Sequence, residues 1–222
     1  MRVPPCQRRF CLAVAAVMLA VAPVSAAKVS DAEVLERFQL WLDGTRQLEA
    51  RFEQTLVSGA LGAGPAESGR LYILRPGRMR WDYLEPERKV ALVLGERTRL
   101  YLEEDRQLWE GTLDASETVL PALLASGGRI VELFESGPSA TERRGGDGAY
   151  RLSLVPRSDE EAFEEITVSV RPPDYGIAAV EVLDAAGNRM LYEFSGIRRN
   201  EELAPGIFDF EPPEGTEVVA RP

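Results

Sequence analysis

The apolar residues of segment 30–45 recur at the spacing of a helix. Those that share one face are Val34, Phe38, Trp41, Leu42 and Thr45. Ser30 and Glu33 have the spacing of a capping box, which satisfies two free backbone N–H groups at the start of a helix. Gly44 is a signal for its end. The pattern therefore predicts an amphipathic helix of about four turns.

After residue 47 the apolar period changes from 3.6 to 2. Leu48, Ala50 and Phe52 alternate with polar residues, as in a strand with one buried face. A loop is predicted at 59–68 because of its glycines and alanines, and further runs have strand character. These runs are 69–75, 78–83, 89–94, 98–103, 106–112, 129–135, 149–155, 163–170, 177–184 and 189–196. A hairpin turn is predicted at 184–188.

A short helix interrupts the strands at 115–127, where Ser116 has the position of a cap and Pro121 lies in the first turns. Short turns separate the other elements, which suits antiparallel neighbours because parallel strands need crossovers of about a dozen residues. We therefore expect a mainly β protein of about 10–11 strands with a few helices. An antiparallel sheet that curls into a barrel, with helices over one opening, satisfies this order of elements.

Residues 1–26 have the layout of a secretory signal peptide. Three arginines precede an apolar run at 10–22, and small residues lead to the expected cleavage after Ala26. The run is shorter than the roughly 20 residues that a membrane span needs. Both cysteines lie in this segment, so residues 27–222 offer no disulfide, thiol nucleophile or thiolate metal site. We expect 27–222 to form one soluble domain outside the cytoplasm.

The charge balance and the lack of histidine narrow the chemistry. The chain has 26 Lys and Arg against 36 Asp and Glu, a net charge of −10. Such a surface repels the phosphates of nucleic acids and anionic lipid headgroups, so neither nucleic acid binding nor lasting adsorption to a membrane is expected. Without histidine there is no histidine-based triad, proton shuttle or imidazole metal ligand. No cofactor or metal is predicted.

The segment 69–83 has the most specific pattern in the chain. Met79, Trp81 and Tyr83 share one face of a strand, whereas the alternate positions are charged. For a single strand, an ordinary core opposite solvent is the simpler explanation. Arg75 has the parity of an inward-facing row, where a buried cation needs partners. An arginine that reaches water at the strand end fits the pattern equally well.

The same segment resembles the signature of the LolA family of outer-membrane lipoprotein carriers. Its pattern combines Gly69-x-Leu71, Arg75-Pro76 and Met79-x-Trp81. Further matches follow in chain order over about 30–219. They are Leu48-x-Ala50-x-Phe52-x-Gln54, Gln107, Pro121-Ala122-Leu123-Leu124, Leu154-Val155-Pro156, Phe163-Glu164-Glu165-Ile166 and Phe208-x-Phe210-x-Pro212-Pro213-x-Gly215-x-x-Val218. Each motif is weak by itself, but their order behind a signal peptide is specific.

One stretch departs from the family pattern. Where the family usually has Asp-Gly followed by Leu-Trp-x-Tyr, this chain has Leu94-Gly95 and then Thr98-Arg99-Leu100-Tyr101. Gly95 and Tyr101 are retained, whereas the Asp and the Leu-Trp pair are replaced. The departure leaves the expected fold intact and bears on the cargo.

The resemblance implies an unclosed β-barrel with a helical lid over a hydrophobic cavity. LolA-family proteins accept the acyl chains of lipoproteins from an ABC-type, LolCDE-like complex of the inner membrane and hand them to a LolB-like acceptor at the outer membrane. The chain is thus expected to be a monomeric periplasmic carrier that contacts membranes only transiently. Arg75 and Pro76 would form the lid gate, in which the arginine bonds to the lid of the empty form. The implied cavity residues are Phe52, Leu71, Ile73, Met79, Trp81, Tyr83, Leu92, Leu123, Leu124, Ile166, Val168, Met190, Tyr192 and Phe194.

Three other functions fit parts of the sequence. The chain could carry a non-protein lipid, or it could be a periplasmic sensor that detects lipid or lipoprotein with the same barrel. An enzyme could use carboxylates such as Glu103-Glu104-Asp105 or Asp159-Glu160-Glu161. Adjacent acids in a loop are more typical of a solvated turn than of a matched acid and base, which need contrasting environments. We therefore expect no enzymatic activity.

Overall fold

The elements of the chain are one long helix, two short helical segments and a series of strands. The computed structural model describes residues 29–113, 119–137, 148–157 and 163–220, so the expected signal peptide lies outside the described residues. The elements are α1 (Asp31–Asp43), β1 (Gln47–Ser58), β2 (Gly62–Ala63), β3 (Glu67–Leu74), β4 (Arg78–Glu85), β5 (Lys89–Leu94), β6 (Arg97–Leu102), β7 (Gln107–Thr112), η1 (Pro121–Ala125), α2 (Ile130–Leu133), β8 (Phe134–Ser136), β9 (Tyr150–Pro156), β10 (Phe163–Arg171), β11 (Gly176–Asp184), β12 (Arg189–Arg199) and β13 (Glu217–Ala220).

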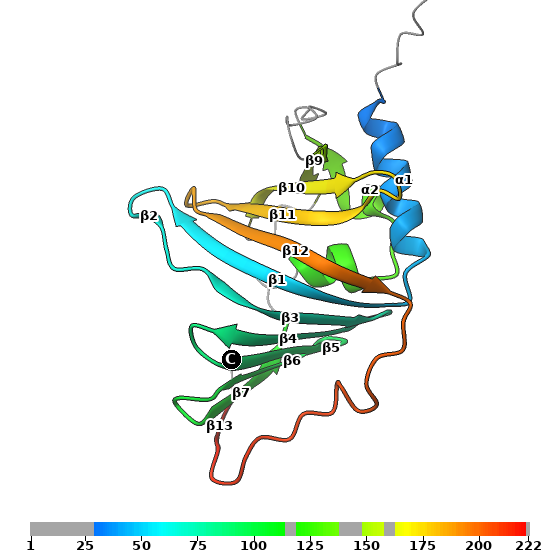
Figure 1. Ribbon diagram of the computed structural model, residues 1–222. Helices are drawn as coiled ribbons and strands as arrows, with labels where there is room; N and C mark the ends of the chain where they lie inside the picture. The colour runs from blue at the N-terminus through cyan, green and yellow to red at the C-terminus, as the bar shows by residue number, and fades with distance from the viewer. Residues whose placement is uncertain (1–28, 114–118, 138–147, 158–162, 221–222) are drawn as a thin grey trace, which may run out of the picture.

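The strands form one strongly curved sheet with α1 across one end of it (Figure 1). Its 13 strands follow the order β13-β7-β6-β5-β4-β3-β1-β12-β11-β10-β9-β8, and β2 pairs with β1. Neighbouring strands are antiparallel except for β13, which runs parallel to β7. Among the described residues, the two edges of this path, β13 and β8, are not paired to each other. The expected mainly β, unclosed antiparallel architecture is therefore confirmed.

Helix α1 begins and ends where its sequence predicts. The side chain of Ser30 accepts a hydrogen bond of 3.2 Å from the backbone N–H of Glu33, and Gly44 caps the other end. The Glu33 carboxylate pairs with Arg37 one turn later, at 2.5 Å. The four apolar residues Val34, Phe38, Trp41 and Leu42 are buried against the sheet. The apolar face of α1 is therefore part of the core.

The strand predictions are confirmed with one correction and two additions. Residues 130–133, expected to be strand, form the short helix α2, and only 134–136 are extended. In this segment Ile130 is buried, whereas Val131 and Leu133 are exposed, so the apolar run does not belong to one strand face. The additions are β2, inside the expected loop, and the parallel strand β13. The hairpin turn at 184–188 is confirmed by two backbone N–H groups that donate to Asp184.

The short helix predicted within 115–127 is present as η1, a single π-helical segment. The expected cap, Ser116, lies outside the described residues. Leu123, Leu124 and Ala125 of η1 are buried in the same core as α1 and the inner face of the sheet. Thus η1 covers part of the concave face.

The two faces of the sheet support different cores. Paired residues of neighbouring strands point to the same face, so Leu71, Trp81 and Ala91 lie on the inner face. By the same register Leu92 lies on the outer face, together with Arg80 and Arg99. Leu92, Tyr101, Leu108 and Phe208 are buried, although none belongs to the main core of α1 and the inner face. The outer face therefore has its own small apolar layer.

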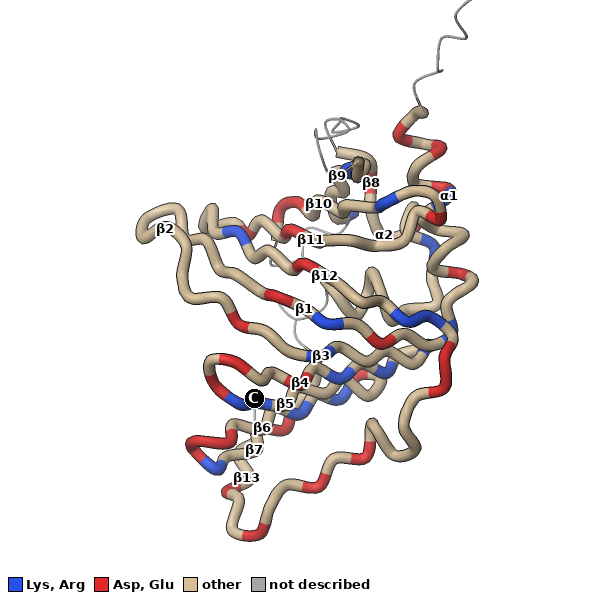
Figure 2. The backbone as a smooth tube through the Cα atoms, in the orientation of Figure 1, with Lys and Arg blue, Asp and Glu red and all other residues tan. Residues whose placement is uncertain are grey.

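The C-terminal segment (201–216) covers this outer layer. The guanidinium of Arg80 donates to the carbonyl of Ile207 at 2.6 Å, and that of Arg99 donates to the carbonyl of Phe210 at 2.7 Å. The Phe210 ring also lies 5.3 Å from that of Tyr101. Figure 2 shows acidic residues along the segment and basic residues on the strands beside it. Hydrogen bonds and apolar burial therefore both hold the segment against the outer face.

We predict that the substitution Phe208→Ala lowers the free energy of unfolding by about 3 kcal/mol, because a buried aromatic side chain leaves a cavity when it is truncated. Phe208 is only 7% exposed. The measurement is urea denaturation. The control is Leu61→Ala, at a residue that is 90% exposed, which should change stability by less than about 0.5 kcal/mol. Equal effects of the two changes would contradict the outer core.

Candidate functional site

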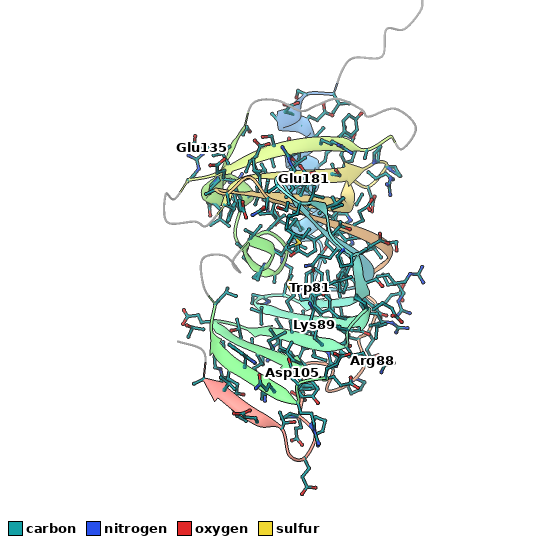
Figure 3. All side chains as sticks on the ribbon, turned by 90° about the vertical axis from the view of Figure 1, so that its left-hand side faces the viewer. Trp81, Arg88, Lys89, Asp105, Glu135 and Glu181 are labelled. Atoms are coloured by element: carbon teal, nitrogen blue, oxygen red, sulfur yellow. The ribbon has the colours of Figure 1, made fainter. Side chains whose placement is uncertain are left out.

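A cavity of about 540 Å³ opens on the inner face of the sheet. Its wall comes mainly from β4, β5, β6, β7 and β12 and from residues 119–121, just before and at the start of η1, and β1, β10 and β11 contribute further residues. Figure 3 views the open side of the molecule and labels Trp81 and Lys89 of this wall. The apolar wall residues include Trp81, Tyr83, Ala91, Val93, Leu100, Leu102, Trp109, Leu113, Val119, Leu120, Pro121, Met190 and Tyr192. Its volume lies within the range of about 300–1,000 Å³ that small-molecule sites have.

An aromatic cluster holds Trp81 at the cavity wall. The Trp81 ring lies 4.7 Å from Phe52 in an edge-on arrangement and 5.6 Å from Tyr192. Tyr83 stacks beside Trp81 at 6.5 Å and meets the edge of Phe52 at 4.9 Å. Edge-on and offset contacts of this kind stabilise the rings beyond their buried area. The cluster therefore fixes the position of Trp81 and makes this part of the cavity wall apolar.

The structure separates the sequence-predicted cavity residues into three groups. Trp81, Tyr83, Met190 and Tyr192 line the cavity. Leu71, Ile73, Leu124 and Phe194 surround a gap of about 10 Å³ beside α1, which is at most the size of one water molecule. The rest of the inner-face candidates are packed in the main core, namely Phe52, Met79, Leu123, Ile166 and Val168.

Leu92, a predicted cavity residue, is part of the strand that forms the cavity wall, but the strand register places its side chain on the outer face. Leu92 lies along the wall, but its side chain alternates with those of Ala91 and Val93, which are on the inner face. It is 1% exposed and belongs to the outer layer under the C-terminal segment. The strand β5 is apolar at both parities from Val90 to Leu94, so alternation alone could not assign its faces.

Several wall residues were missed by the sequence-based reasoning. The most notable are Lys89, Thr98, Leu100 and Trp109, which share the inner face of β5, β6 and β7. A charged residue such as Lys89 looks like a solvent-facing position in the sequence. The register from Trp81 through Ala91, Leu100 and Trp109 would have identified the face, but strand pairing is not written in a single sequence. The signal in the sequence that could have identified the inner face was the alternation of apolar residues around Trp81.

A polar group lies at the open end of the cavity. Lys89 pairs with Glu67 at 2.5 Å and lies over the ring of Tyr83 at 4.3 Å. The Tyr83 hydroxyl donates to Gln54 at 2.8 Å. Burial, with the nearby charge of Glu67, raises the pKa of Tyr192 to about 12, and burial likewise raises the pKa of Tyr83. Both phenols therefore stay neutral at physiological pH, and the lysine charge is balanced by Glu67.

Arg75 connects the helical segments α1 and η1, which form the lid, to the turn after β3. Its Nε donates to the carbonyl of Ser126 at 2.8 Å, next to the end of η1, and its terminal nitrogens bond to the carbonyls of Ser126 and Leu42. Burial lowers the pKa of Arg75, and the charge of Asp43 opposes that shift. Pro76 follows in the turn between β3 and β4, where the Gly77 N–H donates to the Ala125 carbonyl at 2.9 Å. The turn, α1 and η1 are thus joined at one place.

Two further properties concern the described part of the chain. No group of three or more His, Cys, Asp or Glu side chains there is arranged to hold a metal ion. None of its helices is long and apolar enough to cross a membrane.

A curved sheet with an apolar cavity under a helical cover defines a protein that binds an apolar ligand. The chain belongs to the LolA family, since the family model described as "Outer membrane lipoprotein carrier protein LolA" matches residues 43–211. The resemblance seen in the sequence is therefore confirmed.

Similar proteins cover nearly the same length. The outer-membrane lipoprotein carrier protein of Azotobacter vinelandii is 31% identical over 210 residues, which is 94% of this chain and 96% of that protein. The protein of the same name from Methylococcus capsulatus is 30% identical over 183 residues, 82% and 85% of the two chains. A crystal structure of an uncharacterized conserved protein from Thermus thermophilus has a TM-score of 0.51 at 17% identity and covers 86% of this chain and 98% of that one. That last likeness concerns the fold alone.

The raised pKa of Tyr192 predicts a specific loss of stability in alkali. The unfolded chain releases this proton near pH 10 and the folded protein only near pH 12. The contribution of the neutral phenol to stability is therefore complete below about pH 10 and declines between about pH 10 and 12. Stability of the wild type should fall more steeply over that window than stability of Tyr192→Phe, as measured by urea denaturation at each pH. Parallel curves would show that Tyr192 is not desolvated.

Proposed function

We propose that the protein is a carrier that binds the acyl chains of lipoproteins in its cavity and moves them between two membranes. The observation that supports this most is the apolar cavity of about 540 Å³, open at one end and covered by a lid that Arg75 holds. The relatives from Azotobacter vinelandii and Methylococcus capsulatus bear the name of outer-membrane lipoprotein carriers and match most of the chain. The cavity, the lid and the family membership all support this function.

The need for such a carrier follows from the free energy of acyl chains in water. Each buried CH₂ group contributes about 0.8 kcal/mol, so three chains of palmitate length are held in a membrane by roughly 35 kcal/mol. Escape through water is too slow to be useful. An apolar wall such as that around Trp81 replaces the bilayer during transfer. A cavity that is adaptable, and not rigidly complementary to its ligand, also permits release.

The partners follow from family membership. The donor is an ABC-type, LolCDE-like complex of the inner membrane, and the acceptor is a LolB-like protein of the outer membrane where one exists. The carrier works in the periplasm as a monomer, after removal of residues 1–26, and it contacts membranes only transiently. It makes and breaks no covalent bond in its cargo.

The direct test adds the purified protein to inner-membrane vesicles that hold a newly made lipoprotein and the ATP-driven release complex. We expect the lipoprotein to appear in the soluble fraction in a complex with the carrier and with its covalent mass unchanged. Omission of ATP is the first control. A variant with a charge in the wall, Trp81→Asp, should retain no cargo, because a carboxylate in an apolar wall is costly to bury. A stable complex with another protein and no transfer would support the sensor instead.

The gate predicts that Arg75→Leu accepts cargo but releases it poorly. The arginine bonds to Ser126 and Leu42 in the closed form, and each charge-assisted bond contributes about 1.5–3 kcal/mol. Their loss should shift the balance towards the open, loaded form by about tenfold or more. Transfer to an acceptor membrane measures this, with cargo binding as a separate readout.

The matched control is Arg78→Leu, at an exposed arginine on the other side of the same turn. It should deliver cargo at the wild-type rate. If Arg75→Leu delivers cargo as fast as Arg78→Leu, the hydrogen bonds of Arg75 do not gate the lid.

A further inference from the structure

Lys89 is a charged residue in the mostly apolar wall of the cavity. It is the first residue of β5, and it is paired in register with Tyr83 and Leu102, which line the cavity beside it. Its side chain is 23% exposed, and its ammonium group lies 4.3 Å from the centre of the Tyr83 ring. Figure 3 shows Lys89 on the open side of the molecule, near Trp81. The side chain of Lys89 is therefore open to a ligand that enters the cavity.

The ammonium group of Lys89 has more donors than the protein uses. An ammonium carries three N–H donors and no acceptor. Among the described residues, the structure gives it one acceptor, the carboxylate of Glu67 at 2.5 Å. An arginine would tend to direct two parallel N–H groups at the same carboxylate, whereas a lysine pairs with it as a point charge. Lys89 thus keeps N–H donors for a ligand while it remains paired with Glu67.

The charges around Lys89 favour a neutral acceptor over an anion. Glu67 balances the lysine charge, and Asp184 also lines the cavity. In the turn before β5, Glu85 and Glu87 stand against the single cation Arg88. This excess of acidic groups disfavours a phosphate or another anionic headgroup. A carbonyl oxygen accepts a hydrogen bond from Lys89 without this electrostatic cost.

The cavity beyond Lys89 offers a path for hydrocarbon. Along β5 its inner face continues with Ala91 and Val93, and Val93 is four residues from Lys89, or about 13 Å along the strand. Leu120 and Pro121, beside and at the start of η1, line the same cavity. A ligand with a carbonyl group at Lys89 can therefore extend an alkyl chain over apolar residues only.

We propose that Lys89 binds the ester carbonyl groups that join the acyl chains of the cargo to glycerol. Each ester places a hydrogen-bond acceptor at the end of its hydrocarbon, so the ammonium and the apolar wall beyond it match the two parts of the ligand. A few placed polar groups in an apolar pocket fix the orientation of a ligand and its chemical class. The proposal rests on the acyl-binding function and adds the linkage that the site recognises.

The experiment measures how two soluble lipids displace an apolar fluorescent dye from the purified protein. Dioctanoylglycerol has two ester carbonyls, whereas dioctylglycerol ether has chains of the same length without them. The quantity of interest is the affinity for the ester divided by the affinity for the ether. We expect this ratio to be roughly five- to tenfold higher in the wild type than in a variant without the ammonium, the usual effect of one hydrogen bond. Comparing ratios cancels the different solvation of the two lipids.

The variant without the ammonium combines Lys89→Met with Glu67→Gln, so that neither charge is left without its partner. The matched control is Arg88→Met, at the exposed cation that precedes Lys89 in the chain and is labelled beside it in Figure 3. It should keep the wild-type ratio. A merely structural role of Lys89 would weaken the binding of both lipids equally. The same ratio in the double variant as in the wild type would overturn the proposal.

A third lipid, dioctanoyl phosphatidic acid, separates ester recognition from anion recognition. The wild type should bind it no more tightly than dioctanoylglycerol, because Glu67 already balances the charge of Lys89. The single variant Glu67→Gln leaves that charge unbalanced and should bind it more tightly than the wild type does. A wild type that prefers phosphatidic acid to dioctanoylglycerol would show that Lys89 takes an anionic headgroup, which contradicts the ester assignment.

The failure of the broader function would look different. In that case neither dioctanoylglycerol nor the ether would displace the dye, because no alkyl chain would enter the cavity. Binding of both lipids with one ratio in every variant leaves the carrier function intact and refutes only the role of Lys89.

Discussion

The side chain of Arg75 joins α1, η1 and the turn after β3 through hydrogen bonds. Its guanidinium donates to the carbonyls that follow η1 and that end α1, while its own backbone belongs to the turn after β3. Burial lowers its pKa, so the charge is kept in a costly place by these carbonyls. Such bonds are strong only while all partners are in position. The Arg75 guanidinium therefore holds the C-terminal ends of α1 and η1 against the turn after β3.

The inner face of the sheet contains a cavity, whereas its outer face is covered and stabilised by the C-terminal segment. The C-terminal segment covers Leu92 and Tyr101 on the outside, and arginines of β4 and β6 bind its carbonyls. On the inner face, the ring contacts of Phe52 and Tyr192 position Trp81 at the cavity wall. The outer layer and the ring contacts around Trp81 thus hold the strands of the cavity wall from both faces of the sheet.

Local sequence patterns determine much of this fold and less of the site. The capping of α1 by Ser30 and the alternation of Met79, Trp81 and Tyr83 could be predicted because each depends on neighbouring residues alone. The inner and outer faces of β5 could not be assigned from the sequence, since Leu92 and Val93 are both apolar and only pairing with β4 distinguishes them. The parallel strand β13 and the inner position of Lys89 also depend on distant partners. Pairing between strands that are distant along the chain thus cannot be derived from a single sequence.

The proposed function requires that acyl chains of lipoproteins occupy the cavity. The most direct measurement is native mass spectrometry of the protein isolated from the periplasm, followed by extraction and identification of any bound mass. We expect a bound population whose extracts contain acylated peptides or diacylglyceryl-cysteine fragments. A bound lipid without any protein part would contradict the lipoprotein cargo and leave a carrier of another lipid. A protein that is always empty, and that takes no acylated cargo from membranes, would contradict the carrier function itself.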